Sequence, residues 1–396
     1  MVGPYGLKDV KRPRRALEPP VRVWYTDGAR SAIRAALEME GFGASVEGAG
    51  AGNAAAGSSA AEAAARIASS GEALLPAYLC DTLLGPFYQH GLQVRYYDVG
   101  PDLSINLEDL SRRLGQQTRV LLFIHYFGFP QPEPVLRFLA GLRPVLIEDL
   151  THAVWTEWPV TPASPTGESR TEGSPPRIAP GAIGDYVVAS YRKFGEPFDG
   201  GFLRTQDEGG RGSEGMRPPA LATWASPAHC LSALAWSLER SLDSTQSPAG
   251  VGDRATHLAR SLWRSAEAHY DRDRAARAMS PGSRRLLEQL DVAALMTRRR
   301  QAYGHALRQV QGCPHGEPLW PELPEGVCPL VLPMRAHTAD ERGPLRAWLA
   351  RRGLSSVLLW PRAPGVEPRE FPGAAEAVTR LASVLLPMAP GENRAL

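Results

Sequence analysis

The stretch Asp185-Tyr186-Val187-Val188-Ala189-Ser190-Tyr191-Arg192-Lys193-Phe194 contains an unbroken apolar run that leads to a serine and a lysine. A run without alternating polar residues is typical of a strand that is buried on both faces of a sheet. The strand brings Lys193 to its end, shortly before Asp199-Gly200-Gly201. A partly apolar cleft would lower the pKa of this lysine and make it a nucleophile able to form an imine. The alternative is a solvated Lys/Arg pair at a strand end.

A second apolar strand, Pro144–Asp149, ends in a carboxylate and is followed three residues later by His152. Further strand-like runs alternate with helical patterns before it, which predicts an α/β fold with a mainly parallel central sheet flanked by helices. Ligands of such sheets bind at the carboxyl ends of the strands, where Asp149 falls. The strand-like runs are Val21–Tyr25, Ala73–Pro76, Val94–Asp98 and Val120–His125, and the helical ones are Ala32–Glu40, Asp81–His90, Leu107–Leu114 and Glu133–Leu142.

The length of 396 residues favours two domains. We expect a large domain over residues 1–245, with flexible insertions near 41–71 and 159–180, where Gly, Ala, Ser and Pro are frequent. Residues 246–396 are expected to form a smaller C-terminal α+β domain. Its elements are an apolar run Val327–Pro333, a helix Asp340–Arg352, a strand Ser356–Trp360 and a closing helix Ala374–Leu385.

Composition excludes several classes of protein. A net charge of +2 gives no general attraction to nucleic acid, and the four cysteines show no Cys-x-x-Cys spacing, so we expect free thiols and no metal site. The start of the chain lacks the apolar core of a secretion signal, and no apolar run approaches the length of a membrane span. We therefore expect a cytoplasmic protein, and bulk charge says little about its partners.

Three parts of the sequence together suggest pyridoxal 5'-phosphate as cofactor. Lys193 would hold its aldehyde as a Schiff base, and Asp149 would keep its ring nitrogen protonated. The helix start around Ala29 and Arg30 would bind its phosphate through backbone N–H groups and the helix dipole. Each part also has a simpler reading, because an Asp-Gly before a helix can be a plain cap and a strand-end acid can be exposed.

The order of these motifs resembles the DegT/StrS group of nucleotide-sugar aminotransferases. The resemblance covers most of the chain between Val21 and Leu203 apart from the insertions, and rests on Asp27–Ile33, Leu75–Cys80, Tyr97–Val99, Ile124–Pro130, Ile147–Ala153, Gly184–Tyr186, and Lys193–Phe194 with Asp199–Gly201.

This resemblance implies a fold-type I pyridoxal-phosphate enzyme, usually a homodimer. Such an enzyme moves an amino group from glutamate or glutamine to a keto sugar carried on a nucleotide, often for polysaccharide biosynthesis. Matched by position, Lys193 would be the catalytic residue that binds the cofactor, and Asp149 the partner of its ring nitrogen. His152 would be a ring-side contact, Ser190 a phosphate ligand, and Ala29 with Arg30 the helix-start phosphate site.

The sequence departs from the family pattern at three places. Ser190 and Lys193 are closer together than is common, and Cys80 stands where the family often has an aromatic residue against the ring, so that Tyr78 or His152 would have to take this role. Leu359-Trp360-Pro361 replaces the more usual His-Tyr-Pro. Two alternatives therefore remain open: a catalytically silent or regulatory relative, and a cofactor enzyme with another reaction such as dehydration.

Overall fold

The computed structural model describes residues 22–43, 71–157, 178–195, 197–205, 220–223, 226–244 and 251–386. The predicted insertions near 41–71 and 159–180 lie largely outside the described residues, as does the junction at 245 and 246 between the two predicted domains. That division of the chain stays a prediction.

The centre of the molecule is a seven-stranded sheet in the order β1-β7-β6-β5-β4-β2-β3. The five strands from β6 to β3 are parallel, and β7 runs antiparallel to both of its neighbours. This confirms the predicted α/β fold with a mainly parallel sheet. The strands are β1 Arg22–Thr26, β2 Glu72–Pro76, β3 Gln93–Tyr97, β4 Thr118–Ile124, β5 Val145–Asp149, β6 Tyr186–Ser190 and β7 Gly201–Thr205.

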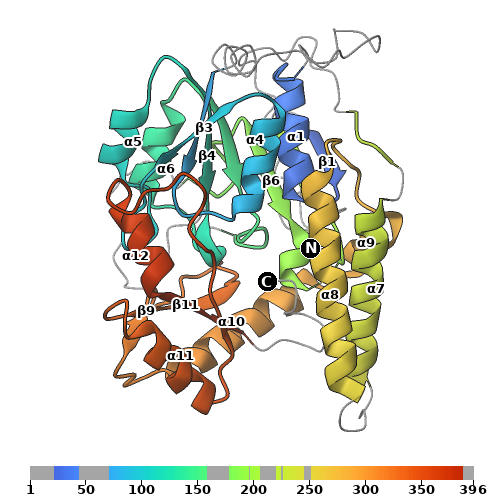
Figure 1. Cartoon of the computed structure of the whole chain (residues 1–396), viewed down its shortest axis with the longest axis vertical. Coiled ribbons are helices and arrows are strands. Elements are labelled where there is room, and N and C mark those ends of the chain that lie inside the picture. The colour runs from blue at the N-terminus through green and yellow to red at the C-terminus, as the bar shows by residue number, and fades with distance from the viewer. Residues whose placement is uncertain are drawn as a thin grey trace.

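Apolar side chains cover both faces of this sheet, as the unbroken strands predict. In β4, Leu121 and Phe123 join a cluster that includes residues of α5 (Leu107–Arg113) and α6 (Glu133–Ala140). Leu122 and Ile124 point to the other face, in the cluster that holds α1 (Ala29–Met39) and α4 (Leu84–Gln89). Figure 1 shows α5 and α6 together on one side and α1 with α4 on the other. The strand ends are thereby held in a rigid core.

A second sheet of four antiparallel strands follows in the order β10-β11-β9-β8. Its strands are β8 Gly316–Pro318, β9 Val331–Ala336, β10 Ser356–Val357 and β11 Leu381–Leu385, accompanied by α10 (Val292–Gln309), α11 (Arg342–Arg351) and α12 (Pro372–Arg380). The predicted closing helix Ala374–Leu385 is wrong over its last five residues. They form β11 because its apolar side chains are buried between two neighbouring strands, which outweighs their local helix propensity.

A helix cap between residues far apart in the sequence joins the central sheet to α12, which accompanies the second sheet. Asp98 follows β3, and its carboxylate accepts hydrogen bonds from the backbone N–H groups of Gly373 (2.9 Å) and Ala374 (2.8 Å) in the first turn of α12. Gly373 is needed there, because a Cβ atom would lie 1.7 Å from the carbonyl oxygen of Val99. Tyr96 adds a hydrogen bond of 2.8 Å to the carbonyl of Pro364. These contacts fix the segment after β10 against the end of β3.

Helices α7 (Pro227–Ser244) and α8 (Val251–Arg272) lie side by side at the edge of the molecule, next to α1 (Figure 1). The helix α9 (Pro281–Gln289) then leads to α10. None of the helices that can be described is both long and apolar enough for a membrane span. The four cysteines are free, as predicted.

Candidate active site

All six predicted site residues line one pocket at the carboxyl ends of the parallel strands. The pocket and its opening to solvent together span about 840 Å³ of empty space. The fold therefore brings together residues from three separate segments: the start of α1, the end of β5 and the end of β6. They are Ala29, Arg30, Asp149, His152, Ser190 and Lys193.

Asp149 and Lys193 come from the ends of two adjacent parallel strands. Asp149 is the last residue of β5 and is 2% exposed, and its carboxylate accepts a hydrogen bond of 2.7 Å from the backbone N–H of Thr151. Burial raises its pKa, although hydrogen bonding by Thr151 opposes the shift. Among the described residues, no cationic side chain forms an ion pair with it. A buried carboxylate of this kind is suited to a positively charged ligand group.

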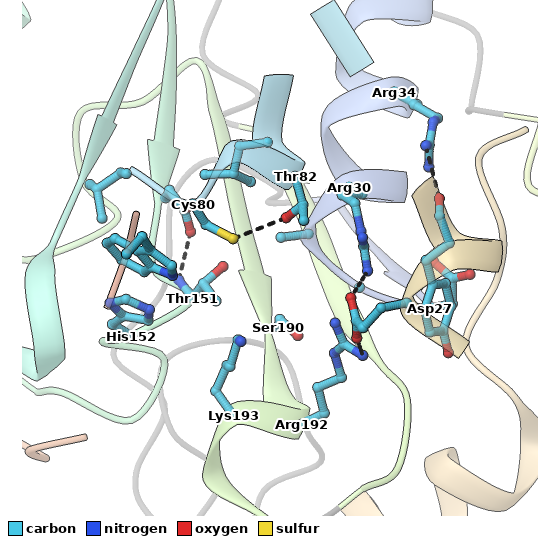
Figure 2. Close-up of a pocket in the computed structure, with 18 of the residues that line it drawn as sticks. Asp27, Arg30, Arg34, Cys80, Thr82, Thr151, His152, Ser190, Arg192 and Lys193 are labelled. Carbon is cyan, nitrogen blue, oxygen red and sulfur yellow. Dashed lines mark hydrogen bonds and ion pairs between the residues drawn. The ribbon is translucent and has the colours of Figure 1, made fainter. Parts of the chain in front are cut away.

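Lys193 lies in a short 3-10 turn, Tyr191–Phe194, that directly follows β6. Figure 2 shows its amine pointing into the pocket, between His152 and Ser190. Burial lowers the pKa of Lys193, and the charge of the adjacent Arg192 lowers it further. A lowered pKa raises the fraction of neutral amine, which is the nucleophilic form.

The start of α1 forms another wall of the pocket. No side chain caps the helix, and Ala32 makes the first backbone hydrogen bond, to Gly28, so the N–H groups of the first turn have no helical partners. Gly28 faces Ser190 closely, since a Cβ on Gly28 would lie 3.9 Å from the Ser190 hydroxyl oxygen. Backbone N–H groups and a hydroxyl are thus available to one anion.

The guanidinium group of Arg30 makes contacts that the sequence did not predict. It donates to Glu267 over 2.7 Å and also to Asp271, both on α8. Glu267 accepts a further hydrogen bond from Arg192. Tyr270, between the two acids, has both guanidinium groups 5.2 Å from its ring centre. The arginines of this wall are therefore paired with α8.

His152 belongs to a cluster of aromatic rings. Its ring stacks on Phe127 and on Trp360, each with centroids 5.3 Å apart, and its Nδ1 accepts a hydrogen bond from the Phe127 N–H. Burial lowers the pKa of His152 to about 3, with a further contribution from Lys193. The imidazole is therefore neutral near pH 7 and acts as a packing surface.

The assignment of Tyr78 or His152 as the ring-side residue, in place of an aromatic residue at Cys80, stays a prediction. Cys80 lines the pocket with its thiol 3.2 Å from the Thr82 hydroxyl. Tyr78 is buried, and its hydroxyl donates to the carbonyl of Leu359, whereas His152 and Trp360 are among the residues that line the pocket. The sequence contained a signal for Trp360, because Leu359-Trp360-Pro361 stands where the DegT/StrS group usually has His-Tyr-Pro. Glu267 and Tyr270 had no such signal, because they lie in a helix whose pattern resembles a solvated one.

The chain shares its fold with solved sugar aminotransferases. No protein-family model and no curated protein sequence matches it. The sugar aminotransferase CalS13 from Micromonospora echinospora is 18% identical, with a TM-score of 0.52 and coverage of 92% of this chain and 82% of that one.

Two further structures support the same fold. Spr1654 from Streptococcus pneumoniae, solved in its PLP form, is 15% identical, with a TM-score of 0.58 and coverage of 92% and 82%. A DegT DnrJ EryC1 StrS aminotransferase from Brucella abortus is 15% identical, with a TM-score of 0.52 and coverage of 93% and 81%. These similarities establish the fold.

Proposed function

We propose that this protein is a pyridoxal-phosphate-dependent aminotransferase that acts on a keto sugar. The single observation that carries the proposal is the placement of Lys193 and Asp149 in one pocket, on adjacent strand ends, with opposite shifts of pKa. The similar folds of sugar aminotransferases support the substrate class. A nucleotide carrier for the sugar, glutamate or glutamine as donor, a homodimer and a cytoplasmic location are parts of the same proposal.

The residues of the pocket fit the cofactor part by part. When bound, pyridoxal phosphate supplies an aldehyde and a ring that accepts electrons. Asp149, which lacks a cationic partner among the described residues, would hold the proton on the ring nitrogen. The first N–H groups of α1 at Ala29 and Arg30, together with Ser190, would bind the phosphate, and His152 with Trp360 would pack at the ring.

Lys193 has two tasks in this arrangement. Its amine would bind the cofactor's aldehyde, and after the amino donor displaces it, the free amine would carry a proton away from the donor's α-carbon. The lowered pKa of Lys193 suits both tasks, because each begins with a neutral amine. Ser190 lies at the end of the same strand, so one segment positions the anion site and the base.

A spectroscopic experiment tests the proposal. The purified protein with added pyridoxal phosphate is expected to absorb near the violet edge, and borohydride should fix the cofactor covalently on Lys193, as peptide mass spectrometry would show. Lys193→Ala should lose both signals. Addition of glutamate should then shift the wild-type spectrum. An unchanged spectrum with glutamate would contradict amino transfer, and no covalent product at all would contradict the cofactor assignment.

A further inference from the structure

The formal charges of the side chains that line the pocket are balanced before any anion binds. Four cationic side chains line it, and four acidic ones oppose them. A doubly charged phosphate needs a surplus of positive charge on the surrounding wall, because burial of an unbalanced anion is unfavourable. The cations are Arg30, Arg34, Arg192 and Lys193, and the acids are Asp27, Asp149, Glu267 and Asp273.

Glu267 is the acid that pairs with the arginines at the phosphate end. Its carboxylate bridges Arg30 on α1 and Arg192 beside Lys193, whose side chains are 10% and 11% exposed. Burial raises the pKa of Glu267, but the charges of Arg192 and Arg30 outweigh burial and leave it lower than usual. The carboxylate is therefore ionised near pH 7 and neutralises Arg30 and Arg192.

The link between α8 and the pocket is polar. Besides the pairs of Glu267, Asp271 accepts from Arg30, and the carbonyl of Tyr270 accepts from Arg34 over 3.3 Å. The Glu267 side chain is 37% exposed, so it can turn toward solvent when another anion takes its guanidinium partners. A phosphate group and a carboxylate bind the same kind of donor, because both can form bidentate, charge-assisted hydrogen bonds with arginine.

We propose that Glu267 competes with the phosphate group of the cofactor for Arg30 and Arg192, and so weakens the retention of the cofactor. This inference rests on the proposed function and adds that an acidic residue of α8 lowers the affinity of the site for the cofactor. The bound cofactor is then held through Lys193 and Asp149 on the strand side, while the phosphate side exchanges more readily.

The test compares Glu267→Gln with the matched variant Asp271→Asn. Asp271 lies one turn further along α8 and pairs with Arg30, but it does not line the pocket. Removal of one charge from the pocket wall should lower the Kd for pyridoxal phosphate about tenfold or more, whereas D271N should change it less than about threefold. Pyridoxal, which has the aldehyde and no phosphate, should bind to E267Q and wild type equally.

The outcomes separate this inference from the proposed function. If E267Q binds pyridoxal phosphate no more tightly than wild type, Glu267 is a structural clamp and the competition is refuted. If its affinity for pyridoxal rises as well, the effect does not arise at the phosphate, which also refutes it. Glu267→Ala, with the same expected direction, replaces E267Q if that variant does not fold.

A measurement with inorganic phosphate needs no cofactor chemistry. Phosphate should raise the melting temperature of E267Q more than that of wild type. If it does so while no variant forms a covalent link with pyridoxal phosphate, the competition stands and the proposed enzyme function fails. If phosphate stabilises wild type and E267Q equally, the competition fails whatever the cofactor does.

Discussion

Replacement of Glu148 by glutamine is expected to destabilise the folded protein by about 2–6 kcal/mol, at about 1–3 kcal/mol for each of two buried donors left without an acceptor. The fully buried carboxylate of Glu148 accepts four hydrogen bonds, two on each oxygen. Oε1 accepts from His125 (2.9 Å) and Gly181 (2.5 Å), and Oε2 from Ile183 (3.2 Å) and Gly184 (2.8 Å). The network ties the ends of β4 and β5 to the segment that enters β6.

The expected loss of stability follows from the number of N–H donors that would lose their acceptor. His125 cannot accept instead, because its Nδ1 already accepts the N–H of Gln131 over 3.0 Å, which leaves the proton on Nε2. Whichever way the introduced amide turned, its NH₂ group would face two N–H donors. Each buried donor without an acceptor costs about 1–3 kcal/mol, which gives the total of about 2–6 kcal/mol. This is a large share of the stability of an ordinary protein, about 5–15 kcal/mol.

Urea unfolding followed by fluorescence and circular dichroism would measure the effect, with Glu133→Gln as the control. Glu133 pairs with Arg137 on the exposed surface of α6, so its loss should change the unfolding free energy by less than about 0.5 kcal/mol. The expected result is a lower midpoint for E148Q with an unchanged slope. If E148Q and E133Q unfold within about 1 kcal/mol of each other, the hydrogen-bond argument is wrong.

Three further predictions concern acid stability, the cap and the strand-end acid. Burial raises the pKa of Glu148, but the hydrogen bond from His125 and those from the backbone N–H groups of Gly181 and Gly184 outweigh it and hold the pKa below its usual value. The stabilisation from Glu148 is therefore present above the ordinary glutamate pKa and lost as the pH falls through the folded-state pKa. Acid titration of unfolding should show this loss in wild type and not in E148Q. Asp98→Asn should cost about 1–2 kcal/mol, because only one of the two N–H groups of α12 keeps an acceptor; equal melting curves would contradict the cap. Asp149→Asn should leave the cofactor-free protein at least as stable as wild type above about pH 4, because burial raises the pKa of Asp149 and disfavours its charged form. The same substitution should slow the glutamate half-reaction by about 10²-fold. A destabilised variant would refute the first expectation, and an unchanged rate would refute the second.

The parts of the site that could be predicted from the sequence lie at the ends of buried strands. Asp149 and Lys193 each follow an apolar run, and parallel neighbours present their carboxyl ends at the same edge of a sheet, so local pattern was enough to bring them together. Arg192 and Glu267 are 75 residues apart, and Arg30 and Glu267 are 237 apart. Their ion pairs depend on how α8 lies across the pocket, which no local pattern contains.

The same distinction explains the error at β11. The run Leu381–Leu385 continues the apolar periodicity of α12, and only its partners β9 and β10 make it a strand. Those partners come from distant parts of the chain, as the acids of α8 do. Local secondary-structure propensity predicts the elements that pack against their neighbours in sequence. The remaining elements take the structure that their tertiary strand partners impose.

The two sides of the pocket differ in what holds them. Asp149 and Lys193 are fixed by the sheet core, whose side chains lie buried between helices on both faces. The side formed by α8 is held by ion pairs of a half-exposed carboxylate, and such pairs are weak and sensitive to competing anions. In the proposed enzyme, the rigid side therefore sets the positions of Asp149 and Lys193, and the other side sets how easily an anion enters or leaves. Substitutions on α8 should accordingly change the binding of an anion more than they change the positions of Asp149 and Lys193.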